Sequence, residues 1–159
     1  EVQGDLVNGY LGISRRWKKG DVVEVHFDML PRVVKANEKV VADRGRVAIE
    51  RGPIVYCAEW PDNDFNIHTV LLNRKPELQV VQQPDLLYGV RTIRTDAQAL
   101  SYNAAGKLAV KDVKLTLIPY YAWAHRGEGN MAVWLPMEVG AATAQPLKGE
   151  KQEDNGFFK

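Results

Sequence analysis

The sequence has little of what usually marks a catalytic or metal-binding centre. Among its 159 residues there is one cysteine, Cys57, and there are three histidines. A single cysteine excludes an intramolecular disulfide and a cysteine-rich metal site, and no two histidines have the spacing of metal ligands. Phosphate-binding loops, dinucleotide fingerprints and the GxSxG motif of serine hydrolases are also absent.

Charge of one sign and long apolar runs are lacking as well. Lysine and arginine total 21 against 20 for aspartate and glutamate, which leaves a net charge of +1. This balance gives no electrostatic reason to expect nucleic acid or an anionic membrane surface as a partner. The longest apolar runs are far shorter than the ~20 residues that a membrane-spanning helix needs. The chain starts Glu-Val-Gln without methionine, and we expect it to be a piece of a longer protein.

The sequence does contain short alternating runs, which are centred on the stretch RVAIERGPIVYCAE, residues 46–59. Val47 and Ile49 alternate with Ala48 and Glu50, as in a strand with one buried face. The unbroken apolar run of residues 54–57 favours a strand that is covered on both faces. Between the two runs, the Gly-Pro pair predicts a bend, a bulge or a sheet edge.

Similar runs recur along the chain, and no segment has a helix-length apolar stripe. Residues 10–17 and 22–27 predict a β-hairpin around a polar turn at 18–21. One helical turn is expected from Asp96 to Leu100 and a turn at 103–107. Further strands are expected at 32–36, 69–72, 78–81, 88–95, 113–118 and 131–135.

These patterns predict an all-β protein, an antiparallel, jelly-roll-like β-sandwich with little or no helix. The sandwich is expected to span residues 1–137, with residues 1–29 as a candidate for the last hairpin of a preceding sandwich. Residues 138–159 are predicted to be a flexible tail, because this stretch is too polar to offset its ordering entropy.

Few residues suggest chemistry on their own. Cys57 lies in an apolar run and is predicted to be a buried structural cysteine, not a reactive thiol. Asp62 and Asp64 hint at calcium, but the twelve-residue calcium-loop pattern is absent. A glycosidase needs two carboxylates about 5–10 Å apart, and the sequence marks no such pair.

The aromatic loop YYAWAHRGEGN, residues 120–130, is the best functional candidate. Its rings could stack on sugars while the nearby charges bind hydroxyl groups, or the loop could be buried against a neighbouring domain. The residues assigned to this sugar-facing or domain-interface surface are Tyr120, Tyr121, Trp123, His125 and Arg126.

Five ordered motifs between residues 8 and 135 together resemble the C-terminal part of the glycoside hydrolase family 127 enzymes, the β-L-arabinofuranosidase-like proteins. They are NGYLGISRRW, KGDVV, KANEKV, GRVAIERGPIVY and IPYYAWAHRG followed by MAVW. One position departs from the family pattern: His125 stands where asparagine would be expected.

The resemblance implies a parent enzyme in which an upstream (α/α)6 barrel carries catalysis and two β-sandwich domains follow. It also implies a retaining glycoside hydrolase with a cysteine nucleophile held by zinc. None of these catalytic residues maps onto this chain, which has no adjacent cysteine pair and carries Cys57 in a sandwich motif. No catalytic, cofactor-binding or metal-binding residue is therefore assigned here, and zinc is expected only in the absent barrel.

Three hypotheses follow for the function of the chain. In the first, it is a non-catalytic accessory domain whose partner is the upstream barrel of the same polypeptide. In the second, it is a carbohydrate-binding module with Trp60, Tyr121 and Trp123 as a stacking platform. In the third, it is a self-contained hydrolase that uses sandwich carboxylates. The resemblance implies a bacterial parent that acts on a plant-type glycan, with a periplasmic or extracellular location.

Overall fold

The computed structural model describes residues 6–143 and 145–146, and all of its longer elements are strands. The predicted all-β class is therefore confirmed, and helix is limited to short 3-10 turns. The strands are β1 Leu6–Val7, β2 Tyr10–Leu11, β3 Pro31–Lys35, β4 Arg46–Arg51, β5 Ile54–Glu59, β6 Val70–Leu72, β7 Gln79–Gln83, β8 Val90–Tyr102, β9 Leu108–Pro119, β10 Met131–Ala132, β11 Leu135–Pro136 and β12 Gln145–Pro146. The 3-10 turns are η1 Val41–Asp43, η2 Trp60–Asp62, η3 Ile67–Thr69, η4 Tyr120–Ala122 and η5 Val139–Ala141.

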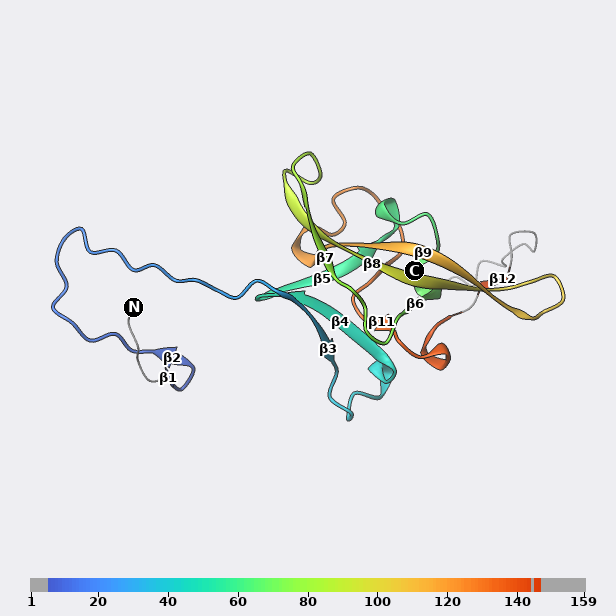
Figure 1. Cartoon of the computed structure of the whole chain (residues 1–159), viewed down its shortest axis with the longest axis horizontal. Helices are drawn as coiled ribbons and strands as arrows, with labels where there is room; N and C mark the ends of the chain where they lie inside the picture. Colours follow the sequence, from blue (N-terminus) through green and yellow to red (C-terminus); the bar gives the residue numbers. More distant parts are fainter. Residues whose placement is uncertain (1–5, 144, 147–159) are drawn as a thin grey trace.

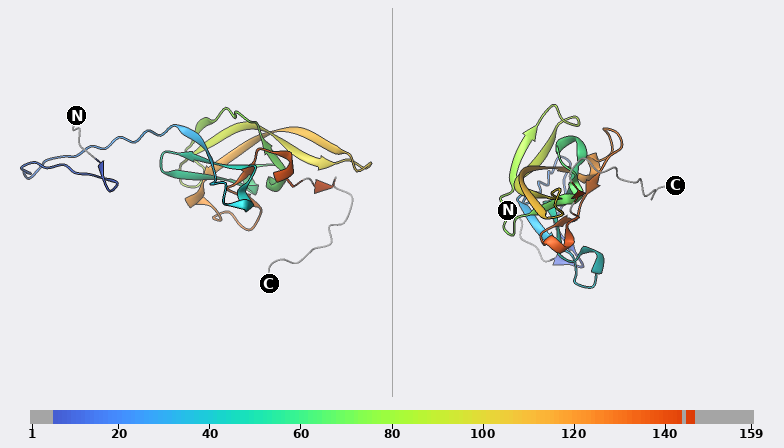
Figure 2. Two further views of the ribbon diagram at one scale, coloured as in Figure 1. Left: turned by 90° about the horizontal axis from the view of Figure 1, so that it is seen from below. Right: turned by 90° about the vertical axis from the view of Figure 1, so that its right-hand side faces the viewer.

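Ten of these strands form one strongly curled sheet that encloses the core like half a barrel (Figures 1 and 2). The β8–β9 hairpin is its longest part, with ten paired positions from Ile93↔Leu117 to Tyr102↔Leu108. One edge of β8 pairs first with β7 and then with β6, while β5 lies on the far side of β9. All pairs are antiparallel except the short β12–β8 contact.

The curl has a local cause where β4 and β5 separate. The two strands pair only near their turn, from Ile49↔Tyr56 to Arg51↔Ile54. Farther from the turn, β10 pairs with the end of β5 and β11 with the start of β4. Because β9 and β3 already occupy the outer edges there, β10 and β11 must fill the fork between β4 and β5. The predicted single strand over 131–135 is therefore wrong: it is two short strands with different partners.

The core lies on the concave face of the sheet and follows the alternation that the sequence shows. Val113, Leu115 and Leu117 of β9 are buried beside Ala97, Thr95 and Ile93 of β8, which are their direct cross-strand partners. Neighbouring strands add Val47, Ile49, Tyr56, Ala58, Ile67, Val70, Leu72 and Leu135. Cross-strand pairs of this kind are the main unit of sheet stabilisation.

The predicted hairpin of residues 10–17 and 22–27 does not form in this chain. Its turn is present, where the Asp21 N–H donates to the Lys18 carbonyl oxygen. Of its first arm only β2, Tyr10–Leu11, is a strand, and it pairs with β1 instead of the second arm. The run 22–27 has no strand structure, and the segment extends away from the sheet (Figure 1). The physical reason is that a two-stranded hairpin without a surface to cover is at best marginally stable in water.

The structure also tests the predictions for residues 96–100 and for the C-terminal tail. The helical turn expected at Asp96–Leu100 is wrong, because these residues lie inside β8, where pairing on both edges outweighs the local N-cap preference of aspartate. In the predicted tail, η5 and the β12 pairing with β8 are ordered, whereas residues 147–159 lie outside the described part of the chain. The domain limits at 29 and 137 stay predictions.

Candidate functional site

The aromatic loop is anchored by a partly buried cluster of three charged side chains, which we call the Arg126 cluster. It consists of Arg126, Glu59 at the end of β5 and Asp62 in η2. The Arg126 guanidinium donates from Nη1 to Asp62 Oδ1 at 2.7 Å and from Nη2 to both carboxylates. The hydrogen bonds to Asp62, the largest cause, and to Glu59 raise the pKa of Arg126 above its usual value despite burial. The guanidinium therefore stays charged and holds the loop to the sheet.

Glu59 is the central residue of the cluster, with a side chain that is only 1% exposed. Its Oε1 accepts the backbone N–H of Ala124 at 3.0 Å, while its Oε2 accepts from Arg126. Ala124 has a left-handed backbone with φ of 66°, an unusual conformation for a residue with a side chain. The carboxylate thus stabilises a strained turn in the loop, and such turns persist only where surrounding contacts hold them.

Trp60 fixes the far end of the loop. Its N–H donates to the Asn130 carbonyl oxygen at 3.0 Å, next to the β10–β5 pairing. Gly129 lies so close to the indole that a Cβ at this position would overlap the ring. A glycine is therefore required at 129 for steric reasons, and the loop is held at both of its ends.

The predicted aromatic residues lie at the surface of this loop. Tyr120 and Trp123 stack with their ring centroids 6.0 Å apart and an angle of 8° between the ring planes. Both are exposed, as are Tyr121 and His125. Trp60 is exposed too, but Tyr120–Trp123 is the sole aromatic stack among the described residues. Whether this surface faces sugar or another domain stays a prediction.

Cys57 is completely buried in β5, between residues that face the core. Burial, together with the negative charges of Glu59 and Asp62, raises the pKa of its thiol to about 12. At pH 7 only about one molecule in 10⁵ would carry the thiolate, which is the reactive form. The prediction of a buried structural cysteine agrees with this position.

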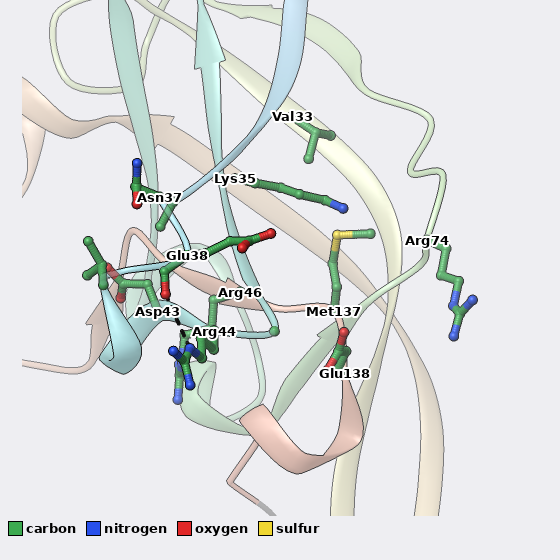
Figure 3. A pocket seen from close by; sticks show the side chains of 13 residues that line it. Val33, Lys35, Asn37, Glu38, Asp43, Arg44, Arg46, Arg74, Met137 and Glu138 are labelled. Atoms are coloured by element: carbon green, nitrogen blue, oxygen red, sulfur yellow. Dashed lines mark hydrogen bonds between the residues drawn. The ribbon is translucent and has the colours of Figure 1, made fainter.

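Two hollows lie elsewhere on the surface. The first, about 640 Å³, is lined by side chains of both charges, and Figure 3 shows Lys35 and Glu38 extending into it. Its charged side chains are Lys35, Glu38, Asp43, Arg44, Arg46, Arg74 and Glu138. None of its lining residues is aromatic, so it offers no ring on which a sugar could stack.

The second hollow, about 530 Å³, brings carboxylates together near the Arg126 cluster. Asp62, Glu77 and Asp96 line it. Asp62 is bound by Arg126 and Asp96 by Lys114, so two of the three carboxylates already have a cation as partner. A glycosidase pair needs one acid and one base on either side of the scissile bond, and Glu77 is the one carboxylate of this hollow that has no cation partner among the described ion pairs.

Sequence reasoning missed the polar residues beneath the loop, above all Glu59 and Asn63. The buried Asn63 side chain forms hydrogen bonds with backbone groups on both of its polar atoms. Its Nδ2 donates to the carbonyl oxygens of Glu59 and Thr116, and its Oδ1 accepts the Thr116 N–H. The one available signal was a carboxylate at the end of an apolar run, since a charge there must find a partner once it is buried.

Neither a metal-binding group of side chains nor a membrane-spanning helix is found in the described part of the chain. Within residues 6–143 and 145–146, no three His, Cys, Asp or Glu side chains are grouped to hold a metal ion. The helical turns of the same residues are too short and too polar to cross a membrane.

Comparison with known proteins identifies the family of this chain. Residues 31–136 match the glycoside hydrolase family 127 C-terminal domain. The chain belongs to this family. A solved GH127 β-arabinofuranosidase is 71% identical, with a TM-score of 0.84 over 91% of this chain and 23% of that chain. The resemblance inferred from the sequence motifs is confirmed.

Two further proteins are similar to this chain. A β-L-arabinofuranosidase from Geobacillus stearothermophilus T6 is 39% identical, with a TM-score of 0.64 over 68% of this chain and 18% of that chain. A non-reducing end β-L-arabinofuranosidase from Bifidobacterium longum subsp. longum is 36% identical over 145 residues, which are 82% of this chain and 22% of that protein. The chain therefore spans less than a quarter of the length of these relatives, which are larger proteins.

Proposed function

We propose that this chain is a non-catalytic C-terminal β-domain that supports the catalytic region of a β-L-arabinofuranosidase. Its match to the family's C-terminal domain, within relatives of about four times its length, supports the placement. The partner is the remainder of the same polypeptide, and the substrate of the whole protein is an arabinose-containing glycan. The chain itself supplies a rigid sheet and the anchored aromatic loop.

The observation that carries the proposal is the environment of Cys57. The family resemblance implies a cysteine nucleophile. The single thiol of this chain is completely buried, and its pKa is raised to about 12. A nucleophilic thiol needs exposure and a neighbouring cation or base that lowers its pKa. Here the charges with the largest effect on the thiol pKa are the carboxylates of Glu59 and Asp62, and they raise it.

The direct test compares the isolated chain with the full-length polypeptide that carries it, using an aryl β-L-arabinofuranoside as substrate. We expect hydrolysis by the full-length polypeptide and none by the isolated chain. Cys57→Ala in the full-length polypeptide is expected to keep kcat within about twofold, because a residue outside the reacting atoms removes no transition-state interaction. Turnover by the isolated chain, or loss of turnover in a folded Cys57→Ala variant, would overturn the proposal.

A second candidate function is weak carbohydrate binding by the aromatic loop. It is favoured by the exposed Tyr120–Trp123 stack, because a rigid, exposed aromatic surface is what sugar stacking requires. The two functions differ in one measurable respect. Titration of the isolated chain with arabino-oligosaccharides should shift the loop resonances in NMR spectra only if the loop binds sugar, and Trp123→Ala should then abolish the shifts.

A further inference from the structure

Arg51, the last residue of β4, is a buried cation without a carboxylate partner in the described part of the chain. Its exposed fraction is 9%, and its Nε has no hydrogen-bond partner there. None of the ion pairs among these residues includes Arg51. A guanidinium does not lose its proton in proteins. Burial of this charge therefore costs free energy until an anionic group pairs with it.

The strand register places a second arginine at the same end of the core. Side chains two positions apart in a strand share a face, so Arg51 follows the core residue Ile49 on β4. Arg91 likewise precedes the core residue Ile93 on β8. The hydroxyl of Tyr56 donates to the Arg91 carbonyl oxygen at 2.9 Å and so connects β5 to this position. The core thus ends between two arginines.

The side chains around Tyr56 are positively charged on balance. Burial raises the pKa of Tyr56, and the charges of Arg51 and Arg91 act against this rise, so both cations lie near its hydroxyl. Tyr121, which is exposed, also affects this pKa. Arg91 donates from Nε to the Gln82 side chain at 3.0 Å and has no ion pair among the described residues. We call Arg51, Tyr56, Arg91 and Tyr121 the Arg51 site.

This combination of groups fits one carboxylate. The planar guanidinium presents parallel N–H donors that match both oxygens of a carboxylate, and such bidentate pairs are among the strongest hydrogen bonds in proteins. A second arginine and the exposed hydroxyl of Tyr121 can donate at the rim of the site. The site contains two cations and two phenol groups, so an acidic partner has to come from outside it.

The chain that precedes the matched family domain passes directly beside the Arg51 site. Pro31, where the family match begins, is the cross-strand partner of Arg51. A Cβ on Gly52 would overlap the Met29 side chain, so Met29 packs on the β4–β5 turn next to Arg51. Figure 1 shows the segment before β3 reaching the sheet at this turn. Any structure that precedes this segment is therefore tethered within a few residues of the site.

We propose that the Arg51 site is a docking point for an aspartate or glutamate side chain from the part of the polypeptide that precedes this chain. Arg51 pairs with the carboxylate in a bidentate manner, and Arg91 and Tyr121 form the rim of the contact. The proposal rests on the proposed function, since it needs a longer polypeptide. The larger relatives supply room for such a partner, because the matched residues are 23% and 22% of their lengths. Tethering also lowers the entropic cost of the contact.

The first arm of the test is the melting temperature of the isolated chain. Arg51→Met is expected to raise it by about 2 °C or more, because an apolar side chain of similar length replaces an unpaired buried charge. Arg94→Met is the matched control. Arg94 is exposed at an alternate position of β8, and its loss is expected to change the melting temperature by less than about 1 °C.

The second arm is amide hydrogen exchange of residues 50–55, measured by mass spectrometry in the full-length polypeptide. Here Arg51→Met is expected to have the opposite effect and to speed exchange by about tenfold or more, because the docked contact is lost. Arg91→Met is the second variant, since an exposed side chain can be replaced without entering the core, and we expect a smaller increase. Arg51→Lys should restore protection only in part, because lysine keeps the charge without the bidentate geometry. Arg94→Met should leave exchange unchanged.

Three results would overturn the proposal. The first is a lower melting temperature of the isolated chain in Arg51→Met, which would show that the guanidinium has its partner within this chain. The second is equal exchange of residues 50–55 in the wild-type isolated chain and the wild-type full-length polypeptide, a comparison that does not depend on how variants fold. The third is stabilisation of both wild-type polypeptides by sodium glucuronate that is lost in Arg51→Met, which would assign the site to a free carboxylate ligand.

The proposed function is tested separately. None of these three results depends on the arabinofuranoside assay, so an Arg51 site without a docking partner leaves the non-catalytic role of the chain untouched. Conversely, turnover by the isolated chain would contradict the proposed function whatever the exchange of residues 50–55 shows.

Discussion

Two runs of this chain have the same alternating pattern and different structures. Val113–Ile118 lies within β9, and its inward side chains Val113, Leu115 and Leu117 are at most 8% exposed. Residues 22–27 alternate just as regularly but form no strand, and their side chains stay in solvent. The difference is the presence of neighbours, since β9 pairs with β8 on one edge and β5 on the other. An alternating pattern shows that a segment is able to form a strand, and pairing with neighbouring strands determines whether the strand forms.

The largest loss of stability is expected when the cation of the Arg126 cluster is removed. Arg126→Met should lower the free energy of unfolding of the isolated chain by about 3–5 kcal/mol, because it leaves the buried Glu59 carboxylate without its cation. Arg32→Met is the matched control, since Arg32 pairs with Glu50 at the surface and should cost at most about 1 kcal/mol. Urea unfolding measures both, and equal losses would show that the Arg126 cluster is no anchor.

The comparison of the two runs can be tested with one truncation in each. Leu115→Ala should destabilise the isolated chain by about 2–5 kcal/mol, the usual cost of a cavity in a packed core. Val25→Ala should change the stability of the isolated chain by less than about 0.5 kcal/mol, because its side chain is exposed. Urea unfolding followed by far-ultraviolet circular dichroism gives both values. A large loss for Val25→Ala would mean that residues 22–27 already pack on the sheet.

Burial of Cys57 in the sheet region is expected to make the free energy of unfolding depend on pH. The unfolded thiol ionises near its ordinary pKa of 9.0, whereas the folded thiol stays protonated to about 12. Above pH 9 the unfolded state therefore binds fewer protons, and stability falls with rising pH by up to about 1.4 kcal/mol per pH unit. Below pH 9 the contribution is constant.

Urea unfolding under reducing conditions at pH 8 and pH 10 checks this slope. Wild type should lose about 1 kcal/mol more than Cys57→Ala over that interval, because the variant has no thiol to ionise. Tyr56, whose pKa burial also raises, contributes equally to both proteins and cancels in the comparison. Parallel pH profiles of the two proteins would contradict the burial of a protonated thiol.

The smallest effect is expected at the aromatic loop. Trp123→Ala should lower the stability of the isolated chain by about 1 kcal/mol through loss of the stack with Tyr120. Tyr121→Ala is the matched control, because Tyr121 is more exposed and has no stacking partner among the described residues. Thermal unfolding compares the two variants, and an equal loss in both would show that the stack adds nothing.

Much of the sheet was predictable from sequence because its signals are local. The alternation over 113–118, the apolar run at 54–57 and the Gly-Pro turn between β4 and β5 all correspond to observed elements. One expectation was too narrow: Ala48 is buried together with Val47 and Ile49, so β4 is covered on both faces there. Three of the motifs that carried the family resemblance, KANEKV, GRVAIERGPIVY and IPYYAWAHRG with MAVW, lie within the matched residues 31–136, whereas NGYLGISRRW and KGDVV precede them.

What escaped prediction depends on distant neighbours. Asp96 looked like the start of a helical turn, but its pairing with Lys114 of β9 places it inside strand β8. The break between β10 and β11 follows from the fork of β4 and β5, which no local pattern reveals. The Arg126 cluster joins residues more than 60 positions apart, and the spacing of Glu59, Asp62 and Arg126 in the sequence does not indicate that they meet.

The most direct test of the account is amide exchange measured for both alternating runs in both polypeptides. We expect protection of residues 113–118 in the isolated chain and in the full-length polypeptide, and protection of residues 22–27 in the full-length polypeptide alone. Protection of both runs in the isolated chain would show that residues 22–27 need no second domain. Absence of protection at 22–27 in the full-length polypeptide would contradict the prediction that residues 1–29 contain the last hairpin of a preceding sandwich.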